Sequence, residues 1–259
     1  MRQDNNTNLF EFQRNGTTWA DGRLEMQTGE RDMGSLGRIE TWQSSSRNEA
    51  YEGKCGQVRG SADGLFPPGI SHLSDSLQFY ATDLCRPLTF SRSGDDSLHG
   101  ISVTKFELSE HNFANTSVCP DNGCYNNNIP TGVQVNKSCL DINFEMILDF
   151  KLSSLQNVTQ CRTKNPAFVS RPHFYQADPS YLSQFQYGMR PDPSRHGSSF
   201  WVEPESSIPV KVEMRLQLNV LLRKIEGIEY LFSDIPQVMF PVFWFEVRKY
   251  KLYMQDDNN

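Results

Sequence analysis

The stretch VKVEMRLQLNVLL, Val210–Leu222, decides the fold class of this chain. Large apolar residues occupy every second position: Val210, Val212, Met214, Leu216, Leu218, Val220 and Leu222. The positions between them are polar: Lys211, Glu213, Arg215, Gln217 and Asn219. Because successive side chains of a strand point to opposite faces, this alternation predicts a β-strand with one face on the core and one in water. At about 3.3 Å per residue the strand would be roughly 40 Å long, which favours a large antiparallel sheet or barrel.

Four further stretches are rich in aromatic and β-branched residues and are predicted to be strands. They are Ser76–Ala81, Gly100–Leu108, Pro166–Ser170 and Val238–Val247. Pro241 places the last of them at a sheet edge or a bulge, because proline cannot donate a hydrogen bond to the strand ladder. The clusters GSADG (60–64) and SRSGDDS (91–97) are typical of turns. The chain shows no internal repeat and no low-complexity linker, so it is predicted to be one mainly β domain, or part of one.

The composition restricts the class of protein. The chain has 259 residues, enough for one large domain or two small ones. Its net charge is −6 without a basic cluster, which argues against nucleic acid as a partner. The sequence lacks an apolar run of about 18 residues, so no membrane-spanning helix is predicted. Its polar start, MRQDNNTNLF, does not resemble a secretory signal peptide.

Six cysteines lie in the sequence: Cys55, Cys85, Cys119, Cys124, Cys139 and Cys161. Their even number and their clustering favour disulfide bonds over free cytosolic thiols. The CPDNGC turn would allow a Cys119–Cys124 bridge worth about 2 kcal/mol on the loop-entropy model, whereas a Cys85–Cys161 bridge would close a longer loop and be worth about 4.5 kcal/mol. No metal site is predicted, because the chain has no C-x2-C pair and its histidines lack ligand spacing. Those histidines are His72, His99, His111, His173 and His196.

N-x-S/T sequons begin at Asn5, Asn15, Asn115, Asn136 and Asn157. Composition alone would give roughly two or three, so the excess favours a glycosylated protein. The cysteines and the sequons together indicate the secretory pathway, although no signal peptide is recognisable. This conflict is resolved if the chain is an internal fragment of a larger, membrane-inserted protein.

A structural corner is predicted in SRPHFYQADPSYLSQF, residues 170–185. Asp178 is suited to the N-cap of a short helix, Pro179 to its first position, and Gly188 to its end. Leu182 and Phe185 are three residues apart and would face the core. The segment is therefore interpreted as a strand end that turns into a capped helix.

The candidate catalytic residues each have a simpler structural explanation. No G-x-S-x-G or equivalent nucleophile motif is present, so His173 is interpreted as a hydrogen-bonded histidine at the corner. Asp95 and Asp96 lie in a predicted turn and are interpreted as a solvated pair. Glu203 and Glu205 could form a glycosidase carboxylate pair, but nothing in their spacing singles them out. The sequence contains no phosphate-binding glycine loop, and no cofactor is predicted.

Several segments keep a characteristic order along the chain. GSADGLFPPGISHLSDSLQFYATDLCRPLTF, Gly60–Phe90, follows Cys55 and carries a Phe-Pro-Pro element and an aromatic strand that ends in acid-x-Cys-Arg. The later segments are FANTS (113–117), NVTQC (157–161), PHFYQADP (172–179) and LQLNVLL (216–222). From about Gly29 to about Phe245 this order resembles the class B scavenger receptor family. Its members include the fatty-acid translocase, the high-density lipoprotein receptor and lysosome membrane protein 2.

This resemblance implies a large antiparallel β-barrel ectodomain with short helices, present in residues 1–259 as an incomplete fragment. It implies a hydrophobic tunnel for lipids such as fatty acids and sterols, and lipoprotein or protein ligands. The parent protein would be anchored in the plasma membrane or the lysosomal membrane, with its ectodomain luminal or extracellular. Because the family consists of receptors and lipid transporters, the resemblance implies no enzymatic activity.

The resemblance further implies a bond between Cys85 and Cys161, with Cys119–Cys124 as the second bridge. A rival pairing, Cys55–Cys119 with Cys124–Cys139, also occurs in outline among relatives. Glycans are expected on four of the sequons: Asn15, Asn115, Asn136 and Asn157. The apical helices that bind macromolecular ligands precede this segment in the family, so no ligand-binding residue is assigned.

Residues 135–156, VNKSCLDINFEMILDFKLSSLQ, interrupt the family pattern, which would read from GVQ directly into NVTQC. They are therefore predicted to be an insertion, either translated intron sequence or a lineage-specific addition. Many of them are large and apolar, which is unusual for an exposed loop. The family's two membrane anchors fall outside the matched segments, and VRKYKLYMQDDNN at the end does not follow the family pattern.

Three functions therefore remain open at the level of sequence. The first is part of a membrane-anchored scavenger or lipid receptor. The second is a secreted β-rich carbohydrate-active enzyme that uses Glu203 or Glu205. The third is a soluble lipid-binding protein.

Overall fold

The structure is a computed structural model, and it describes residues 2–3, 10–11, 22–62, 64–114, 119–125, 155–161, 167–222 and 238–250. The chain divides into two compact units. Unit 1 comprises Met1–Ser109, Ser198–Met214 and Glu246–Asn259. Unit 2 comprises Glu110–Gly197 and Arg215–Phe245. Each unit is thus assembled from segments that are distant in the sequence.

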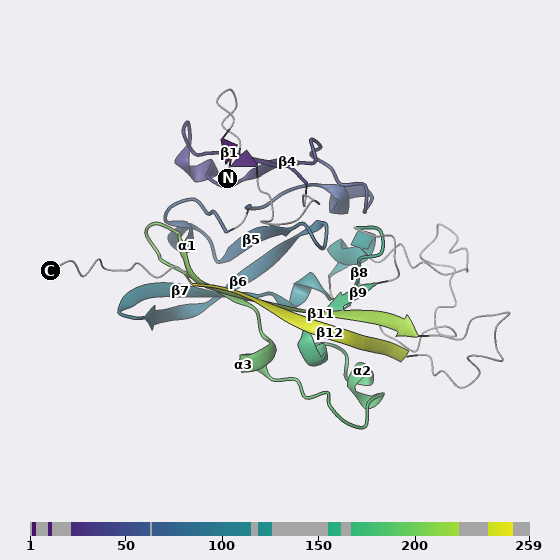
Figure 1. Cartoon of the computed structure of the whole chain (residues 1–259). Coiled ribbons are helices and arrows are strands. Elements are labelled where there is room, and N and C mark those ends of the chain that lie inside the picture. Colours follow the sequence, from purple (N-terminus) through teal and green to yellow (C-terminus); the bar gives the residue numbers. More distant parts are fainter. Residues whose placement is uncertain are drawn as a thin grey trace. The chain divides into compact units, whose positions relative to one another are not determined.

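Unit 1 is built around an antiparallel sheet (Figure 1). Its strands, in their order across the sheet, are β5 (Ser76–Ala81), β6 (Arg86–Leu98), β7 (Ile101–Leu108), β10 (Ser199–Val202) and the first part of β11 (Pro209–Leu222). Two small sheets pair β1 (Arg2–Gln3) with β2 (Phe10–Glu11), and β3 (Leu24–Met26) with β4 (Ile39–Trp42). The helices are short: η1 (Met33–Ser35), η2 (Gly53–Gly56) and α1 (Ile70–Leu73).

The core of unit 1 centres on Phe200 in β10. Its ring makes edge contacts with Phe90 of β6 at 4.7 Å and with Phe66 at 5.9 Å, both measured between ring centroids. Phe79 of β5 lies at 6.0 Å in a tilted arrangement. Phe90, Phe106 of β7 and Phe200 are all buried, so the aromatic residues of separate strands share one apolar interior.

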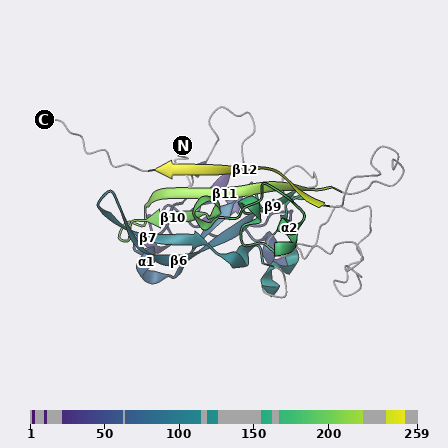
Figure 2. The same ribbon diagram turned by 90° about the horizontal axis from the view of Figure 1, so that it is seen from below.

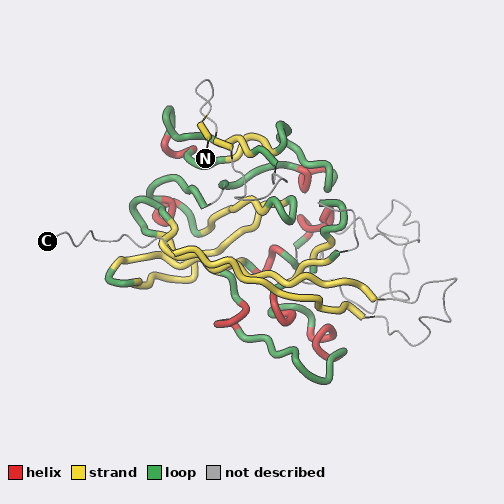
Figure 3. The backbone as a smooth tube through the Cα atoms, in the orientation of Figure 1, coloured by secondary structure: helices red, strands yellow, loops and turns green. Residues whose placement is uncertain are grey.

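Unit 2 combines short helices with the remaining strands (Figure 3). Its helices are η3 (Glu110–Asn112), η4 (Pro120–Tyr125), η6 (Pro172–Phe174), α2 (Pro179–Ser183) and α3 (Pro193–His196). Its strands are β8 (Gln156–Asn157), β9 (Phe168–Ser170), the second part of β11, and most of β12 (Val238–Tyr250). They pair in the order β12-β11-β9-β8, and Figure 2 shows β12 running beside β11.

The core of unit 2 is formed by buried residues from several separate parts of the chain. Leu155, Phe168, Phe174, Tyr181 and Met239 form the buried cluster. The rings of Phe174 and Tyr181 are stacked at 5.4 Å between centroids, which fixes η6 against α2. Burial of the Tyr181 ring raises the pKa of its hydroxyl well above the ordinary value of 10.0, and the nearby Asp178 carboxylate adds to the shift.

The prediction of a mainly β fold is confirmed. The long alternating stretch forms β11, and the other four predicted stretches contain β5, β7, β9 and β12. Within the described residues β12 pairs with β11 alone, so the edge position that Pro241 predicts is confirmed as well. The described strands follow an open path and do not close on themselves.

The predicted turn at residues 91–97 is wrong, because this segment belongs to strand β6. Asp95 and Asp96 pair with Thr104 and Val103 of β7, and a register shift near Gly94 accommodates an extra residue. Such a bulge allows a Gly/Ser-rich segment to remain in a sheet. The composition indicated a turn because it contains no information about β7, the strand that pairs with this segment.

The predicted water-facing side of β11 is also wrong. Its polar residues Glu213, Arg215, Gln217 and Asn219 are buried. Several apolar residues of the opposite face, Val212, Met214, Leu218 and Val220, are partly exposed. Buried polar side chains are tolerated where hydrogen bonds or ion pairs compensate for lost water. Glu213 lies 2.9 Å from Nζ of Lys211, and the contacts of the other three residues are described below.

None of the helices in the described part of the chain has the length and apolar character needed to span a membrane.

Candidate functional site

The predicted corner begins where β9 ends and η6 starts. His173 has a φ of 53°, in the left-handed region, which costs a non-glycine residue roughly 1 kcal/mol. The backbone is held there by a hydrogen bond from His173 N to Oε1 of Gln217 in β11, at 2.8 Å. Phe174 and Gln176 also have positive φ, so the chain reverses direction within a few residues.

His173 and His196 form a stacked pair, which we call the histidine pair. Their ring centroids lie 4.3 Å apart and their planes differ by 12°. Trp244 of β12 makes a T-shaped contact with each ring, with centroid distances of 6.5 Å to His173 and 6.0 Å to His196. His196 is only 2% exposed, so α3 carries one of the most buried polar side chains of unit 2.

Both rings accept a backbone hydrogen bond at the same type of nitrogen. Arg190 N donates to Nδ1 of His173 at 3.1 Å, and Asp192 N donates to Nδ1 of His196 at 2.9 Å. An accepting Nδ1 carries no proton, so the neutral rings hold their proton on Nε2. The geometry therefore fixes the tautomer of both histidines.

The surroundings lower the pKa of both imidazoles below the ordinary value of 6.5. For His173 the main cause is burial, and the positive charge of Arg195 adds to it. For His196 burial also comes first, followed by His173 and Arg195, while the Asp192 carboxylate acts in the opposite direction. The neutral form of the pair is therefore favoured.

Helix α3, which carries His196, depends on its N-cap. Oδ1 of Asp192 accepts hydrogen bonds from the backbone N–H groups of Ser194 at 2.8 Å and Arg195 at 3.3 Å. These bonds, together with one from the Ser194 hydroxyl, hold the pKa of the Asp192 carboxyl below its usual range. Arg215 Nη1 donates to the carbonyl of Gly197, which fixes the other end of the helix.

Next to the histidine pair lies a buried polar cluster formed by Ser170, Gln217 and Asn219. Nε2 of Gln217 donates to Oδ1 of Asn219 at 2.9 Å, and Nδ2 of Asn219 donates to the Ser170 hydroxyl at 3.0 Å. Asn219 is 0% exposed. Because Gln217 also binds the backbone of His173, the cluster connects β11, β9 and the corner.

The helix cap predicted at Asp178 is confirmed. Its side chain accepts from the backbone N–H of Ser180 at 2.9 Å, and Pro179 occupies the first turn. Leu182 and Phe185 pack against the core of unit 2, as the three-residue spacing predicted. The helix ends at Ser183, well before the predicted end at Gly188.

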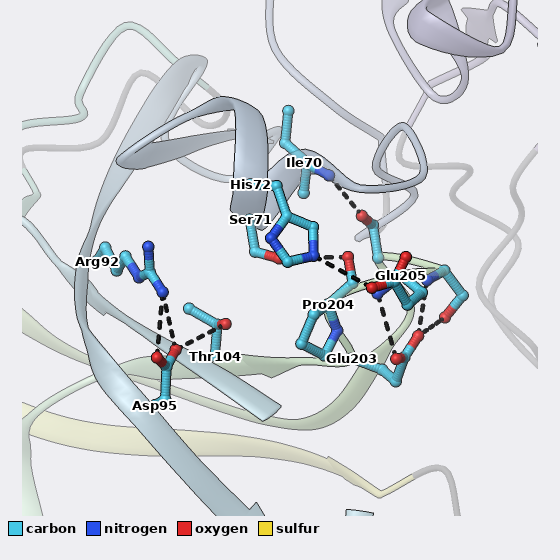
Figure 4. Close-up of polar contacts among 11 residues, drawn as sticks. Ile70, Ser71, His72, Arg92, Asp95, Thr104, Glu203, Pro204 and Glu205 are labelled. Atoms are coloured by element: carbon cyan, nitrogen blue, oxygen red, sulfur yellow. Dashed lines mark hydrogen bonds and ion pairs between the residues drawn. The ribbon is translucent and has the colours of Figure 1, made fainter. Parts of the chain in front are cut away.

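The predicted carboxylate pair does not have the geometry of a glycosidase site (Figure 4). Glu203 points back into its own turn, where Oε2 accepts from Ser206 N at 2.6 Å and Oε1 accepts from Glu205 N at 3.2 Å. Hydrogen bonds from Ser206 hold its pKa below the ordinary value of 4.5. A general acid needs a raised pKa, so Glu203 is suited to capping a turn and not to protonating a leaving group.

Glu205 and Asp95 are exposed and have ion-pair partners. Glu205 Oε1 lies 3.3 Å from Nε2 of His72, and both side chains are mostly exposed. Figure 4 shows a second group, in which Asp95 accepts from Arg92 at 2.9 Å and from Thr104 at 3.0 Å. Arg92 is the main reason why the pKa of Asp95 lies below 3.8. Asp95 is solvated as predicted, but in a strand.

Five of the six cysteines lie in the described part of the chain. Cys55, Cys85, Cys124 and Cys161 are disulfide-bonded, and Cys119 is free. The predicted bridge Cys119–Cys124 is therefore wrong, and so is the rival Cys55–Cys119. Cys119 lies just before the 3₁₀ helix η4, and Cys124 lies within it.

Two other predictions about cysteines stay open. Cys85 and Cys161 are both oxidised, and their bond to each other stays a prediction. Cys139 lies outside the described residues, so a bond between Cys124 and Cys139 is not tested.

Most of the sequons lie outside the described residues: Asn5, Asn15, Asn115 and Asn136. Asn157 is described, in β8, and is 6% exposed. Its Oδ1 accepts from Thr159 N at 2.9 Å. A glycan on Asn157 would have to leave through a nearly closed surface, so the structure does not favour glycosylation at this sequon.

The predicted insertion at 135–156 also lies largely outside the described residues. Its last two residues are described, and both are buried: Leu155 in the core of unit 2 and Gln156 in β8. These two residues are packed against the rest of unit 2, and the insertion at 135–156 stays a prediction.

In the described residues no group of three or more His, Cys, Asp or Glu side chains is arranged to hold a metal ion.

Together these features define a disulfide-stabilised, mainly β domain with a buried polar corner. Its sequence matches the CD36 family over residues 1–257, and the chain belongs to this family. The family resemblance of the sequence motifs is therefore confirmed. This assignment covers nearly the whole chain and does not depend on any single motif.

Individual relatives agree with this assignment. The chain is 32% identical to Protein peste of Drosophila melanogaster over 239 residues, which is 92% of this chain and 39% of the relative. It is 27% identical to Scavenger receptor class B member 1 of Rattus norvegicus over 228 residues, 88% of this chain and 40% of the relative. It is 29% identical to Sensory neuron membrane protein 2 of Manduca sexta over 227 residues, 87% of this chain and 41% of the relative. The chain thus spans about 40% of the length of these relatives.

Sequence reasoning missed two members of the corner. His196 lies in α3 and Trp244 in β12, and neither is near His173 in the sequence. The Asp-Pro before Ser-Arg-His, an N-cap signal like that at Asp178, could have placed α3. No local signal could have shown that its histidine stacks on His173.

Proposed function

We propose that this chain is part of the ectodomain of a membrane-anchored scavenger or lipid receptor, facing the cell exterior or the lumen of an organelle. In this proposal the protein binds lipoprotein or other protein ligands and passes fatty acids or sterols through a hydrophobic tunnel. The match to the CD36 family over residues 1–257 carries the proposal. The names of two relatives, a scavenger receptor and a membrane protein, support it.

Strand β12 is the part of the described chain best suited to contact lipid. Six of its apolar side chains are between 39% and 52% exposed: Phe240, Val242, Phe243, Trp244, Phe245 and Val247. Because neighbouring positions of a strand face opposite sides, apolar side chains are exposed on both faces of β12. Exposed apolar groups this dense are typical of ligand or protein contacts.

The oxidised cysteines support the proposed location. Four of the described cysteines are disulfide-bonded, and such bonds persist in secreted and luminal domains and are rare in the cytosol. Bonding of Cys85 to Cys161 and glycans at Asn15, Asn115 and Asn136 form part of this proposal. Peptide mapping of non-reduced, glycosylated protein tests them together. The plasma membrane and the lysosome are both compatible with these features.

Photocrosslinking with a diazirine fatty acid tests the lipid function in the purified protein. We expect adducts on the peptide that contains Val238–Val247, and competition by excess unlabelled oleate. Replacing both Phe243 and Phe245 with serine should reduce the adducts several-fold. Tyr187→Ser is the matched control, because this aromatic side chain is 86% exposed but lies outside β12. Adducts that resist competition, or that are equally abundant in the double variant, would contradict the proposal.

A further inference from the structure

We propose that the histidine pair is a pH-sensitive latch that holds residues 189–197 closed at neutral pH and releases them when the rings become protonated. The latch consists of the two stacked rings and the two backbone donors that bind them, the N–H groups of Arg190 and Asp192. Both rings and both donors lie in unit 2. The inference concerns a conformational change and stands independently of the lipid function proposed above.

Protonation must break the latch for a chemical reason. In each neutral ring the proton is on Nε2, because Nδ1 accepts a backbone hydrogen bond. The free lone pair is therefore on Nδ1, and a second proton can bind only there. Once protonated, Nδ1 becomes a donor that faces another donor. Each protonation thus replaces a hydrogen bond with a repulsive N–H···H–N contact.

The stacking increases this effect. Two imidazolium rings with centroids 4.3 Å apart would repel each other in an environment where His196 is 2% exposed. Trp244 makes T-shaped contacts with both rings, with interplanar angles of 72° and 81°. The indole carries no charge, so it cannot neutralise a positive charge on the pair.

Some charged groups of the neighbouring elements lower the pKa of the paired histidines, and one raises it. From α3, Arg195 disfavours a positive charge on either histidine. From β11, Arg215 disfavours a charge on His196, and the nearby Gln217 is neutral. At the start of α3, Asp192 favours a charge on His196. Burial and the cations outweigh this single anion, and the pKa of both rings is lowered.

The direction of the pH effect follows from these shifts. Both pKa values in the closed form lie below the ordinary value of 6.5, which the rings regain when the segment opens. Above pH 6.5 both forms are neutral and the closed form keeps its full stability. As the pH falls below 6.5, the open form binds protons first, so the closed form becomes less favoured. Between its pKa in the open form and its lower pKa in the closed form, each histidine changes the opening equilibrium by at most about tenfold per pH unit.

Apart from Met189, which packs against the core of unit 2, the described contacts of the released segment are mostly local. Helix α3 is a single turn, and its cap at Asp192 uses only neighbouring residues. Gly188 has a φ of 91°, and Gly197 follows His196 directly, so a glycine lies at each end of the segment. Glycine can adopt new backbone angles at low cost, which suits a hinge. The contact of Arg215 with the Gly197 carbonyl would remain as the anchor at one end.

Hydrogen exchange of the purified protein tests the latch directly, since the amides of Arg190 and Asp192 are its donors. Exchange is compared at pH 7.5 and pH 5.5, with labelling times scaled for the chemical exchange rate. We expect protection of the 189–197 peptide to fall by about tenfold or more at pH 5.5. Strand β10, which follows in the sequence, should keep its protection. Equal protection of the 189–197 peptide at the two pH values would overturn the proposal.

Two asparagine variants separate the latch from a general acid effect. In His173→Asn and His196→Asn the amide oxygen can take the place of Nδ1 as acceptor but cannot be protonated. We expect each variant to reduce the pH dependence, and the double variant to remove most of it. His72→Asn is the matched control, because His72 is exposed in unit 1 and its loss should leave the response unchanged. An undiminished response in the folded double variant would overturn the assignment.

A measurement on the unaltered protein covers the case in which these variants do not fold. The imidazole carbon resonances of the five histidines, followed by NMR from pH 8 to pH 4.5, report each pKa. Residues 173 and 196 should titrate below 6.5, together with the backbone signals of Arg190 and Asp192. Titration of either ring at or above 6.5 would contradict the latch.

Discussion

The histidine pair of unit 2 and the His72–Glu205 pair of unit 1 place the same type of side chain in opposite environments. His196 is 2% exposed and both rings of its pair bind backbone N–H groups. His72 of α1 and Glu205 are largely exposed, and their side chains lie 3.3 Å apart. Water can replace the exposed contact at little cost, but it cannot reach the buried one.

Two glutamines, one in a strand of each unit, show the same difference between a buried and an exposed polar side chain. Gln217 in β11 is 1% exposed and binds His173 N, Ser170 and Asn219. Gln78 in β5 is exposed, and its amide lies 3.5 Å from the Thr89 hydroxyl. Gln217 therefore carries structural constraints that Gln78 does not. Substitutions at matched positions test this difference between the two units.

The largest difference is expected between the two glutamines. Gln217→Ala leaves the amide of His173 and the polar cluster without partners in a buried position. We expect a loss of about 2–3 kcal/mol in the free energy of unfolding. Gln78→Ala should change it by less than about 0.5 kcal/mol. Urea unfolding at pH 7.5 measures both, and a similar small effect for the two variants would show that the polar cluster is not a structural constraint.

The histidines give the next largest difference. His173→Gln loses the Nδ1 acceptor and the stacking on His196, which predicts a loss of about 1–2 kcal/mol and a lower folding yield. His72→Gln removes one exposed contact and should cost at most about 0.5 kcal/mol. Thermal unfolding at pH 7.5 makes the comparison. A His173→Gln protein that folds normally but loses a specific catalytic turnover would contradict the structural role of His173.

The strands and the cap could be predicted from sequence because their signals are local. Asp178 followed by proline fixes a helix start within three residues, and alternation over Val210–Leu222 fixes a strand whatever its partner. The face of β11 could not be predicted in the same way. Which side of a strand is buried depends on the segments packed against it, and Ser170 and His173 reach β11 from more than 40 positions away.

The same limit applies to the site. The sequence correctly placed His173 at a structural corner, but its partners His196 and Trp244 come from separate elements. The Cys119–Cys124 bridge failed because composition indicated a turn where the chain forms the helix η4. In both cases the missing information was the position of a second segment or the local backbone angle. Residue type and spacing do not contain either.

A smaller effect is expected at the cap of α2. Asp178→Ala removes the acceptor for Ser180 N and should cost about 1 kcal/mol. Asp178→Asn keeps an oxygen acceptor and should retain most of the stability. Urea unfolding of the two variants distinguishes them. If both lose the same amount, the charge of Asp178 matters and not its hydrogen bond.

The smallest effects are expected at the exposed carboxylates of unit 1. Glu203→Gln keeps an acceptor for the Ser206 amide but loses the ionised carboxylate, so it should lower the stability only slightly at neutral pH. Glu205→Gln changes an exposed contact with His72 and should have an equally small effect. The lowered pKa of Glu203 means that its stabilisation is present above about pH 4.5 and is lost as the pH falls through the folded pKa. The difference in stability between wild type and Glu203→Gln should therefore depend on pH only in acid.

The same two variants, Glu203→Gln and Glu205→Gln, test the enzyme hypothesis in a glycan-hydrolysis assay. A glycan-hydrolysing activity of the wild type that either variant abolishes would reverse the interpretation of Glu203 as a turn cap, because a carboxylate held ionised by Ser206 cannot donate a proton to a leaving group.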